Sequence, residues 1–311
     1  MKPKIYIDGK DGTTGLQIYD RLAEREDIDL LLIDEQKRKD PVARQKLMNA
    51  ADVVFLCLPD GAAREAVKLV VNPQTRIIDA STAHRTAPGW TYGFPELSEE
   101  QREKIRNSHR VANPGCHASG LIAAVCPLVT RGVMPADYPL TCFSLTGYSG
   151  GGKKMIAAYE GEKELELFSP RIYGLELHHK HLPEMQKVCG LAVPPVFLPV
   201  VDDYYKGMAT TILLSNRWLA PGTTAQRVWE QLSAHYAGAQ MVQVAPFGGE
   251  TPMIAANTMA GKDTMTLIVY GNEEQTAVTA LFDNLGKGAS GAAVQNMNLI
   301  LGIEESTGLA L

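Results

Sequence analysis

The chain has 311 residues, of which 45% are hydrophobic and 21% charged, and this composition is typical of a globular protein with a sizeable core. Its formal net charge of -5 gives no reason to expect nucleic acid or an anionic membrane as a partner. No stretch approaches the roughly 18 apolar residues that span a bilayer, and no apolar leader follows the N-terminus. Five cysteines without CxxC spacing indicate reduced thiols, so we expect a cytoplasmic protein.

The first third of the chain alternates short apolar strands with helices. Helices are predicted at residues 14–24 and 62–71, and strands at residues 4–9, 29–34, 53–58 and 76–81. Continuous apolar strands between helices are what a parallel sheet covered on both faces requires. The pattern therefore predicts an α/β, doubly wound domain.

The next segment places a turn before an apolar helix. Ser98 followed by Gln101 is a capping-box signal for a surface helix. A short strand is predicted at residues 111–113, and Pro114-Gly115 then forces a turn. The helix that follows is predicted to kink or end at Pro127.

From about residue 140 the pattern changes to longer β-type runs with helices between them. These runs lie at residues 140–146, 195–201, 208–214, 241–244 and 264–270. They predict an α+β domain with a mostly antiparallel sheet, and residues 284–302 are predicted to form a final helix.

The loop between the first strand and the first helix is rich in glycine. Gly9, Gly12 and Gly15 let the backbone turn tightly, and the helix that starts around Thr13 and Thr14 offers free N–H groups to a phosphate. The spacing is GxxGxxG rather than GxGxxG, so an ordinary glycine turn is the alternative. The position of the loop favours a dinucleotide-binding site.

Asp34 lies about 20 residues after this loop, at the end of the second predicted strand. An acidic group there can hold a ribose hydroxyl of NAD. Lys37, Arg38 and Lys39 follow at once and are suited to the extra phosphate of NADP, or they form a solvated charge run. The residues alone do not decide whether the cofactor is NAD or NADP.

Cys116 lies where a strand and a tight turn meet an apolar helix. A helix N-terminus lowers the pKa of a thiol from about 8.5, and its N–H groups stabilise an oxyanion on an attacked carbonyl. A lone cysteine is more often a small buried hydrophobe, and the other four cysteines fit that description. Cys116 is the predicted nucleophile.

Three histidines stand in the segment His178-His179-Lys180-His181-Leu182-Pro183-Glu184. No partner pattern for zinc accompanies them, so we expect no metal. His179 and His181 share a face if the chain is extended, and either is suited to acid/base work beside Cys116 with Glu184 orienting it. A surface histidine cluster is the alternative.

A second glycine-rich segment follows the predicted strand at residues 140–146. Ser149 and Gly150 begin it, and Lys153-Lys154 ends it. Either this loop closes on the cofactor or substrate, or it simply connects a strand to a helix.

Taken together, these residues resemble the N-acetyl-gamma-glutamyl-phosphate reductase family, specifically its shorter form. Besides the motifs above, the similarity rests on Asp79–Ser81, on Tyr92–Leu97 and on the C-terminal run DNLGKGASGAAVQNMN at residues 283–298. Several motifs in one order are more specific than any single one. The nearest rivals are aspartate-semialdehyde dehydrogenase and an acyl-phosphate reductase with a carrier-linked substrate. A regulatory protein that senses NADPH without turnover is the non-enzymatic alternative.

The resemblance implies a Rossmann domain at residues 1–117 with 284–311, and a glyceraldehyde-phosphate-dehydrogenase-like α+β domain at residues 118–283. It implies NADP(H) as cofactor, a small acyl phosphate as substrate, a place in arginine biosynthesis, and Cys116 as the thioester-forming nucleophile with His179 preferred over His181. It also implies that Ser81 and Asn296 belong to the cofactor site. A homo-oligomer, dimer or tetramer, is the default expectation for such an enzyme.

Overall fold

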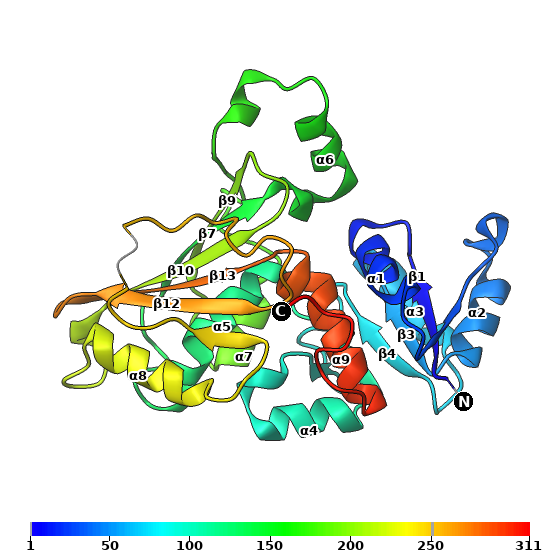
Figure 1. Cartoon of the computed structure of the whole chain (residues 1–311), viewed down its shortest axis with the longest axis horizontal. Helices are drawn as coiled ribbons and strands as arrows, with labels where there is room; N and C mark the ends of the chain where they lie inside the picture. Colours follow the sequence, from blue (N-terminus) through cyan, green and yellow to red (C-terminus); the bar gives the residue numbers. More distant parts are fainter. Residues whose placement is uncertain (1, 250–251) are drawn as a thin grey trace. The chain divides into compact units, whose positions relative to one another are not determined.

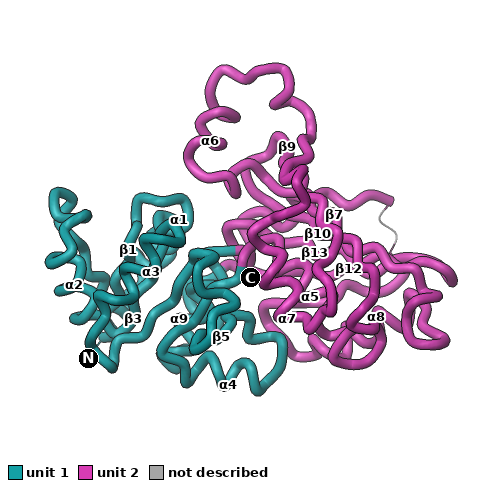
Figure 2. The backbone as a smooth tube through the Cα atoms, turned by 180° about the vertical axis from the view of Figure 1, so that it is seen from behind, with its two compact units in different colours: residues 1–114, 289–309 teal, residues 115–288, 310–311 magenta. Residues whose placement is uncertain are grey.

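The computed structural model describes residues 2–249 and 252–311, and the chain divides into two compact units (Figure 2). The first unit runs to Pro114 and takes up the chain again at Ala289–Leu309, while the second comprises Gly115–Gly288 with Ala310–Leu311. The resemblance implies boundaries after residues 117 and 283. The first lies earlier because Cys116 already begins a helix of the second unit. The other lies later because Asn284 is held inside that unit, where its side chain bonds Ser149 and the backbone of Gly207.

The first unit is built on a six-stranded sheet of order β2-β1-β3-β4-β6-β5, in which every described pairing is parallel. Its strands are β1 (Lys4–Asp8), β2 (Asp29–Leu31), β3 (Val53–Leu56), β4 (Arg76–Asp79), β5 (Thr91–Tyr92) and β6 (Arg110–Ala112). Its helices are α1 (Thr13–Ala23), α2 (Pro41–Ala50), α3 (Asp60–Leu69), α4 (Glu99–Asn107) and α9 (Gly291–Leu301). Ser98 caps α4 as predicted, accepting a hydrogen bond from the Gln101 amide at 3.0 Å.

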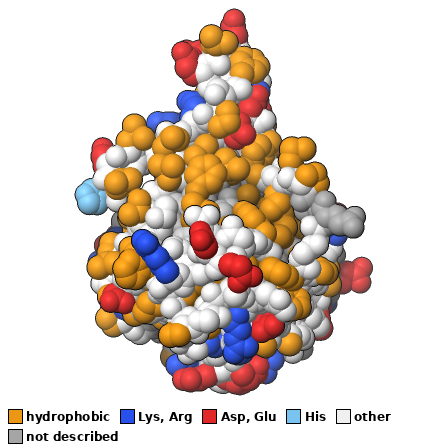
Figure 3. Space-filling view, turned by 90° about the vertical axis from the view of Figure 1, so that its left-hand side faces the viewer, with side chains coloured by type: hydrophobic (Ala, Val, Ile, Leu, Met, Phe, Trp, Pro, Cys, Tyr) orange, Lys and Arg blue, Asp and Glu red, His pale blue; other side chains and the backbone are white. Residues whose placement is uncertain are grey.

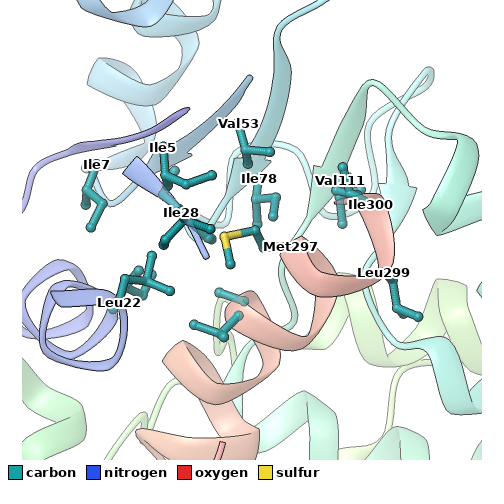
Figure 4. Close-up of a cluster of buried hydrophobic side chains, with 14 of the residues drawn as sticks. Ile5, Ile7, Leu22, Ile28, Val53, Ile78, Val111, Met297, Leu299 and Ile300 are labelled. Carbon is teal, nitrogen blue, oxygen red and sulfur yellow. The ribbon is translucent and has the colours of Figure 1, made fainter. Parts of the chain in front are cut away.

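Helices cover both faces of this sheet because its strands are apolar on both sides. Ile5 and Ile7 of β1 pack on the face that carries α1, α4 and α9, while Tyr6 packs on the face that carries α2 and α3. Successive side chains of a strand point to opposite faces, so the continuous apolar runs serve two cores. Figure 4 shows the first of these cores, with Met297 of α9 among strand residues. The doubly wound prediction is confirmed.

The second unit is built on a seven-stranded sheet of order β11-β12-β13-β10-β7-β9-β8 (Figure 1). Its strands are β7 (Thr141–Gly147), β8 (Arg171–Ile172), β9 (Val196–Asp202), β10 (Met208–Ser215), β11 (Val242–Val244), β12 (Met265–Gly271) and β13 (Gln275–Phe282). Its helices are α5 (Cys116–Thr130), α6 (Gly152–Glu160), α7 (Leu182–Cys189) and α8 (Ala225–His235). Most neighbouring strands are antiparallel, as predicted, and β11–β12 and β7–β9 are the parallel pairs.

Two features of the second unit differ from the sequence predictions. Strand β13 was not predicted, although it pairs with both β10 and β12 and is buried along most of its length. Helix α5 passes through Pro127 and ends only at Thr130. Pro127 has no N–H to offer the carbonyl of Ala123 four residues earlier, and the hydroxyl of Tyr236 donates to that carbonyl at 2.8 Å instead.

The helices α5 and α8 pack against one face of this sheet, and the other face carries partly exposed apolar side chains. On this open face, Leu213 of β10 is 51% exposed and Tyr270 of β12 is 42% exposed. Figure 3, which looks onto the second unit, shows hydrophobic side chains gathered in broad areas. None of the helices in the described part of the chain has the length and apolarity that crossing a bilayer requires.

Candidate active site

A side chain would not fit at either end of the glycine turn between β1 and α1. Gly9 has φ +88°, and a Cβ there would lie 2.4 Å from the carbonyl oxygen of Cys57. A Cβ at Gly15 would lie 2.3 Å from the carbonyl oxygen of Gly9. Gly12 precedes α1 as its N-cap, and Thr13 and Thr14 begin the helix. Free N–H groups at a helix start beside such a tight turn are suited to a phosphate.

A cavity of about 290 Å³ opens beside this turn. Gly9 and the following Lys10 and Asp11 line one part of it, and residues 30–33 with Arg38 and Lys39 line another. Arg38 forms ion pairs with Asp11 and, at 2.8 Å, with Glu35. The cavity therefore joins a phosphate-binding turn to two cations, which fits the adenosine part of a dinucleotide with a 2′-phosphate.

Asp34 is placed next to this cavity in the chain but does not line it. Its carboxylate accepts a hydrogen bond from the backbone N–H of Gln36 at 3.0 Å and so caps a short 3₁₀ turn. The assignment of Asp34 to a ribose hydroxyl stays a prediction, and the cap gives the residue a structural task of its own.

Ser81 belongs to a compact turn at the end of β4. Its hydroxyl donates to the carboxylate of buried Asp79 at 2.7 Å, and the same carboxylate lies 2.6 Å from Nδ1 of His84. This arrangement explains the spacing of the Asp79–Ser81 motif as a fold requirement. A cofactor contact of Ser81 stays a prediction.

Asn296 of α9 is fully buried and joins two neighbouring segments of the first unit. Its Nδ2 donates to the carbonyl oxygen of Gly93 at 2.9 Å and to Oδ1 of Asn113 at 3.2 Å. Its own Oδ1 has no hydrogen-bond partner among the described residues. An unsatisfied buried acceptor marks a place for a ligand donor such as a carboxamide N–H. The residues present thus fit a nicotinamide dinucleotide, although no contact of Asn296 with one has been tested.

Cys116 is the first residue of α5 and is partly exposed, whereas the twelve residues that follow it are buried. Gly115 is the N-cap, and its N–H donates to Oε2 of Glu184 at 3.1 Å. A Cβ at Gly288 would lie 3.0 Å from the Cβ of Cys116, so glycine leaves room there. The turn before Cys116 is thus held by a buried carboxylate, and Cys116 lies at the positive end of a helix, as the predicted nucleophile should.

His179 and His181 lie together just before α7. The N–H of His181 donates to Nδ1 of His179 at 3.2 Å, and the two rings meet edge to face at 4.7 Å. The chain turns here rather than running extended, since His181 is the N-cap of α7 in helical conformation. His181 is buried, while His179 is partly exposed. Glu184 is buried in the first turn of α7, and the predicted role of orienting a histidine is untested.

His117, the second residue of α5, lies next to both of these histidines. Its ring centroid lies 5.4 Å from that of His179 and 5.8 Å from that of His181. Nδ1 of His117 lies 2.8 Å from the hydroxyl of Ser144, and Nε2 lies 2.6 Å from the hydroxyl of Tyr173. Burial, followed by the charges of His179 and Lys180, lowers the pKa of His117 to about 3. His117 is therefore neutral at physiological pH.

Tyr173 follows β8 and is the other residue that the sequence analysis missed. Burial, and then the charge of Cys116, raise the pKa of its hydroxyl, so Tyr173 and the nucleophile lie in one electrostatic environment. His117 was within the motif around Cys116, and its place directly after the nucleophile was the available signal. Nothing in the sequence around Tyr173 distinguished it.

Ser149 and Gly150 lie in a short 3₁₀ turn that leads into α6. The hydroxyl of Ser149 accepts from Nδ2 of Asn284 at 2.9 Å, and its N–H bonds the carbonyl of Tyr205. The turn is therefore anchored within the second unit, and its predicted contact with cofactor is untested. Across residues 2–249 and 252–311, no group of three or more His, Cys, Asp or Glu side chains is placed to hold a metal ion.

Two family models match the chain, one in each unit. Residues 4–107 match "Semialdehyde dehydrogenase, NAD binding domain", and residues 116–284 match "Semialdehyde dehydrogenase, dimerisation domain". A protein of Nostoc sp. named N-acetyl-gamma-glutamyl-phosphate reductase 2 is 47% identical, with 99% of both chains covered. A protein of Pseudomonas putida with the same name is 48% identical over 98% of this chain and 99% of its own.

Solved structures agree on the fold. Aspartate semialdehyde dehydrogenase II from Vibrio cholerae, complexed with ASA, has a TM-score of 0.74 at 16% sequence identity. The match covers 97% of this chain and 99% of the other. At this identity the similarity concerns the fold alone, and it supports the predicted pairing of a dinucleotide-binding unit with an α+β unit.

Proposed function

Since this chain belongs to the N-acetyl-gamma-glutamyl-phosphate reductase family of semialdehyde dehydrogenases, we propose that it reduces N-acetyl-glutamyl 5-phosphate to N-acetyl-glutamate 5-semialdehyde and releases phosphate. NADPH is the reductant, and the step belongs to arginine biosynthesis. One observation carries the proposal: Cys116 begins a buried helix next to a histidine cluster, with its turn fixed by Glu184.

Cys116 performs the first half of the reaction. Its thiolate attacks the acyl carbonyl, a C–S bond forms, and the C–O bond to phosphate breaks as phosphate leaves with the electron pair. An acyl phosphate is already activated, so position and a good nucleophile are what the protein adds. The N–H groups at the start of α5 face the oxyanion that forms on the way.

The histidines serve the second half. NADPH, when bound, would supply the hydride to the carbonyl carbon of the Cys116 thioester, and a proton given to the carbonyl oxygen by a neighbouring histidine would complete the thiohemiacetal. Collapse of that adduct frees the sulfur and requires a group that takes up the hydroxyl proton. We assign this task to His179 rather than His181, because His179 is partly exposed and exchanges protons with solvent, while His181 is buried at the helix start.

The cofactor preference rests on the cavity beside the glycine turn. Arg38 and Lys39 line it, and Asp34 is occupied as a cap. Two cations at the ribose end favour a 2′-phosphate over a free hydroxyl, which supports NADPH over NADH.

The open face of the second unit's sheet supports a homodimer as the minimal assembly. Leu213 and Tyr270 expose apolar surface on it, and the unit matches a family model described as a dimerisation domain. A second copy of the chain is the partner that buries this face. The free thiols agree with a reducing compartment, which supports a cytoplasmic location.

Replacement of Cys116 by serine tests the function. Phosphate-dependent reduction of NADP with N-acetylglutamate semialdehyde should fall by about 10⁴-fold or more, while NADPH affinity is retained. Cys126→Ser is the matched control, since Cys126 lies on the same helix and its Sγ donates to the carbonyl of Val188. The proposal fails if Cys116→Ser turns over normally, or if the wild-type protein prefers aspartate semialdehyde.

A further inference from the structure

A chain of hydrogen bonds runs from the sheet of the second unit to the neighbourhood of the nucleophile. It links the hydroxyl of Thr210 to that of Ser144 at 2.8 Å, Ser144 to Nδ1 of His117 at 2.8 Å, and Nε2 of His117 to the hydroxyl of Tyr173 at 2.6 Å. Thr210 and Ser144 are both fully buried.

The close packing that forms this chain is specific to the sequence. Gly120 lies three residues after His117 on α5, and a Cβ there would lie 2.7 Å from Oγ1 of Thr210. Only glycine lets the helix approach β10 this closely. Ser144 and Thr210 are register partners on β7 and β10, so their hydroxyls meet across the sheet.

The number of protons that these side chains carry decides which of them donate and which accept. Two aliphatic hydroxyls, one neutral imidazole and one phenol together carry four protons that can be donated. Only three hydrogen bonds link these four side chains. One proton is therefore left over, on Tyr173, on Thr210 or on Ser144, and Ser144 is as fully buried as Thr210. If it were left on Thr210 or on Ser144, that hydroxyl would be a buried donor with no further partner among the residues that the structure describes.

The other end accommodates the remaining proton at lower cost. A buried unsatisfied donor costs about 1–3 kcal/mol, whereas Tyr173 is only partly buried. The favoured arrangement has Thr210 donating to Ser144, Ser144 donating to Nδ1, and Nε2–H donating to the phenol oxygen. The hydroxyl proton of Tyr173 is then not used within the chain, and no second partner for it is found among the described side chains.

We propose that Tyr173 is a catalytic residue that donates its hydroxyl proton in a hydrogen bond to the acyl oxygen of the substrate on Cys116, and that His117 is the positioning residue that turns this proton outward. The inference deepens the proposed function and rests on Cys116 as the nucleophile. The neutral state of His117 agrees with it, because a protonated imidazole would lose its acceptor for Ser144.

Acylation by p-nitrophenyl acetate tests the proposal without the specific substrate. The Cys116 sulfur attacks the ester carbonyl, the C–O bond breaks, and p-nitrophenolate leaves and is measured. Loss of one oxyanion donor costs about 10²–10³-fold in rate, so Tyr173→Phe should slow single-turnover acylation by up to this range. Binding of the ester, read from the concentration dependence, should change little.

The double variant separates positioning from a general structural effect. His117→Asn should slow acylation about tenfold in the wild-type background and have no further effect in the Tyr173→Phe background, because both changes remove one interaction. Should His117→Asn fail to fold, Ser144→Ala replaces it. Without the hydroxyl of Ser144, Nδ1 of His117 can carry the imidazole proton, and Tyr173 then donates its hydroxyl proton to Nε2 instead of to the substrate. Multiplicative effects, or acylation of Tyr173→Phe at the wild-type rate, would overturn the proposal.

Tyr236→Phe is the matched control. Tyr236 is also a buried tyrosine that bonds α5, but its hydroxyl reaches Ala123, seven residues beyond the nucleophile. Its acylation rate should equal that of the wild type. The ester reaction also separates this inference from the proposed function: if the wild type does not oxidise N-acetylglutamate semialdehyde, the proposed function fails, while acylation still decides the role of Tyr173.

Discussion

Arg38 is held between two carboxylates, those of Asp11 and Glu35, at the edge of the dinucleotide cavity. The Arg38 guanidinium can still bind a phosphate, because a phosphate dianion competes well against partly exposed carboxylates. The neighbouring Lys39 lines the same cavity. We therefore expect the choice between NADPH and NADH to depend on these two side chains.

Substitution of Arg38 by alanine should raise the KM for NADPH about tenfold, which corresponds to about 1.4 kcal/mol for one charge-assisted contact. The KM for NADH should change much less, since NADH has no 2′-phosphate. Steady-state kinetics with both cofactors measures the ratio. Lys68→Ala is the control, because Lys68 pairs with Glu65 on α3 and does not line the cavity. Equal losses with both cofactors would contradict this assignment.

Residue-level prediction from the sequence was possible where a local pattern is typical of a chemical role. Cys116 could be named because a turn followed by an apolar helix is visible in the sequence, and the structure does place it first in α5. The task of Asp34 as a cap and the partnership of His117 with Tyr173 were not visible. Tyr173 lies 56 residues beyond His117, so only the fold brings their hydrogen bond about.

Helix α5 shows how an element depends on a residue far along the chain. Pro127 removes one backbone donor, and Tyr236 supplies the missing hydrogen bond to Ala123. The sequence predicted a kink or an end at Pro127. The helix continues instead, because Tyr236, the C-cap residue of α8, donates a hydrogen bond to the buried carbonyl of Ala123 that Pro127 leaves without a backbone partner.

Removal of that donor should weaken the second unit. Tyr236→Phe should lower the free energy of unfolding by about 1–3 kcal/mol, since a buried carbonyl loses its partner. Urea denaturation measures it. Pro127→Ala restores a backbone N–H for the same carbonyl and should recover part of the loss in the Tyr236→Phe background. If the second substitution brings no recovery, the hydroxyl of Tyr236 has another role.

At the scale of the whole molecule, the open face of the second unit's sheet is the surface on which we expect a second copy to bind. Leu213 of β10 and Tyr270 of β12 both lie on this face, and β13 runs between their two strands. A monomer would leave both of these apolar side chains in water.

Leu213→Glu should shift the protein from dimer to monomer at micromolar concentration, because each copy would bury an unpaired carboxylate. Sedimentation velocity over a range of concentrations measures this. Val42→Glu provides the comparison, since Val42 is an exposed residue of α2 in the other unit. An unchanged dimer in Leu213→Glu would move the interface away from this face.

The sequence alone determined the two kinds of domain and the position of the glycine turn, and it predicted Cys116 as the nucleophile, because these depend on local periodicity and on residues adjacent in the chain. It did not determine β13, whose residues become a central strand only between β10 and β12. Nor did it determine the path from Thr210 to Tyr173, which exists only because helix α5 and two paired strands bring four distant side chains within hydrogen-bond distance. Hydrogen bonds form between neighbours in space, and for these residues only tertiary packing makes them neighbours.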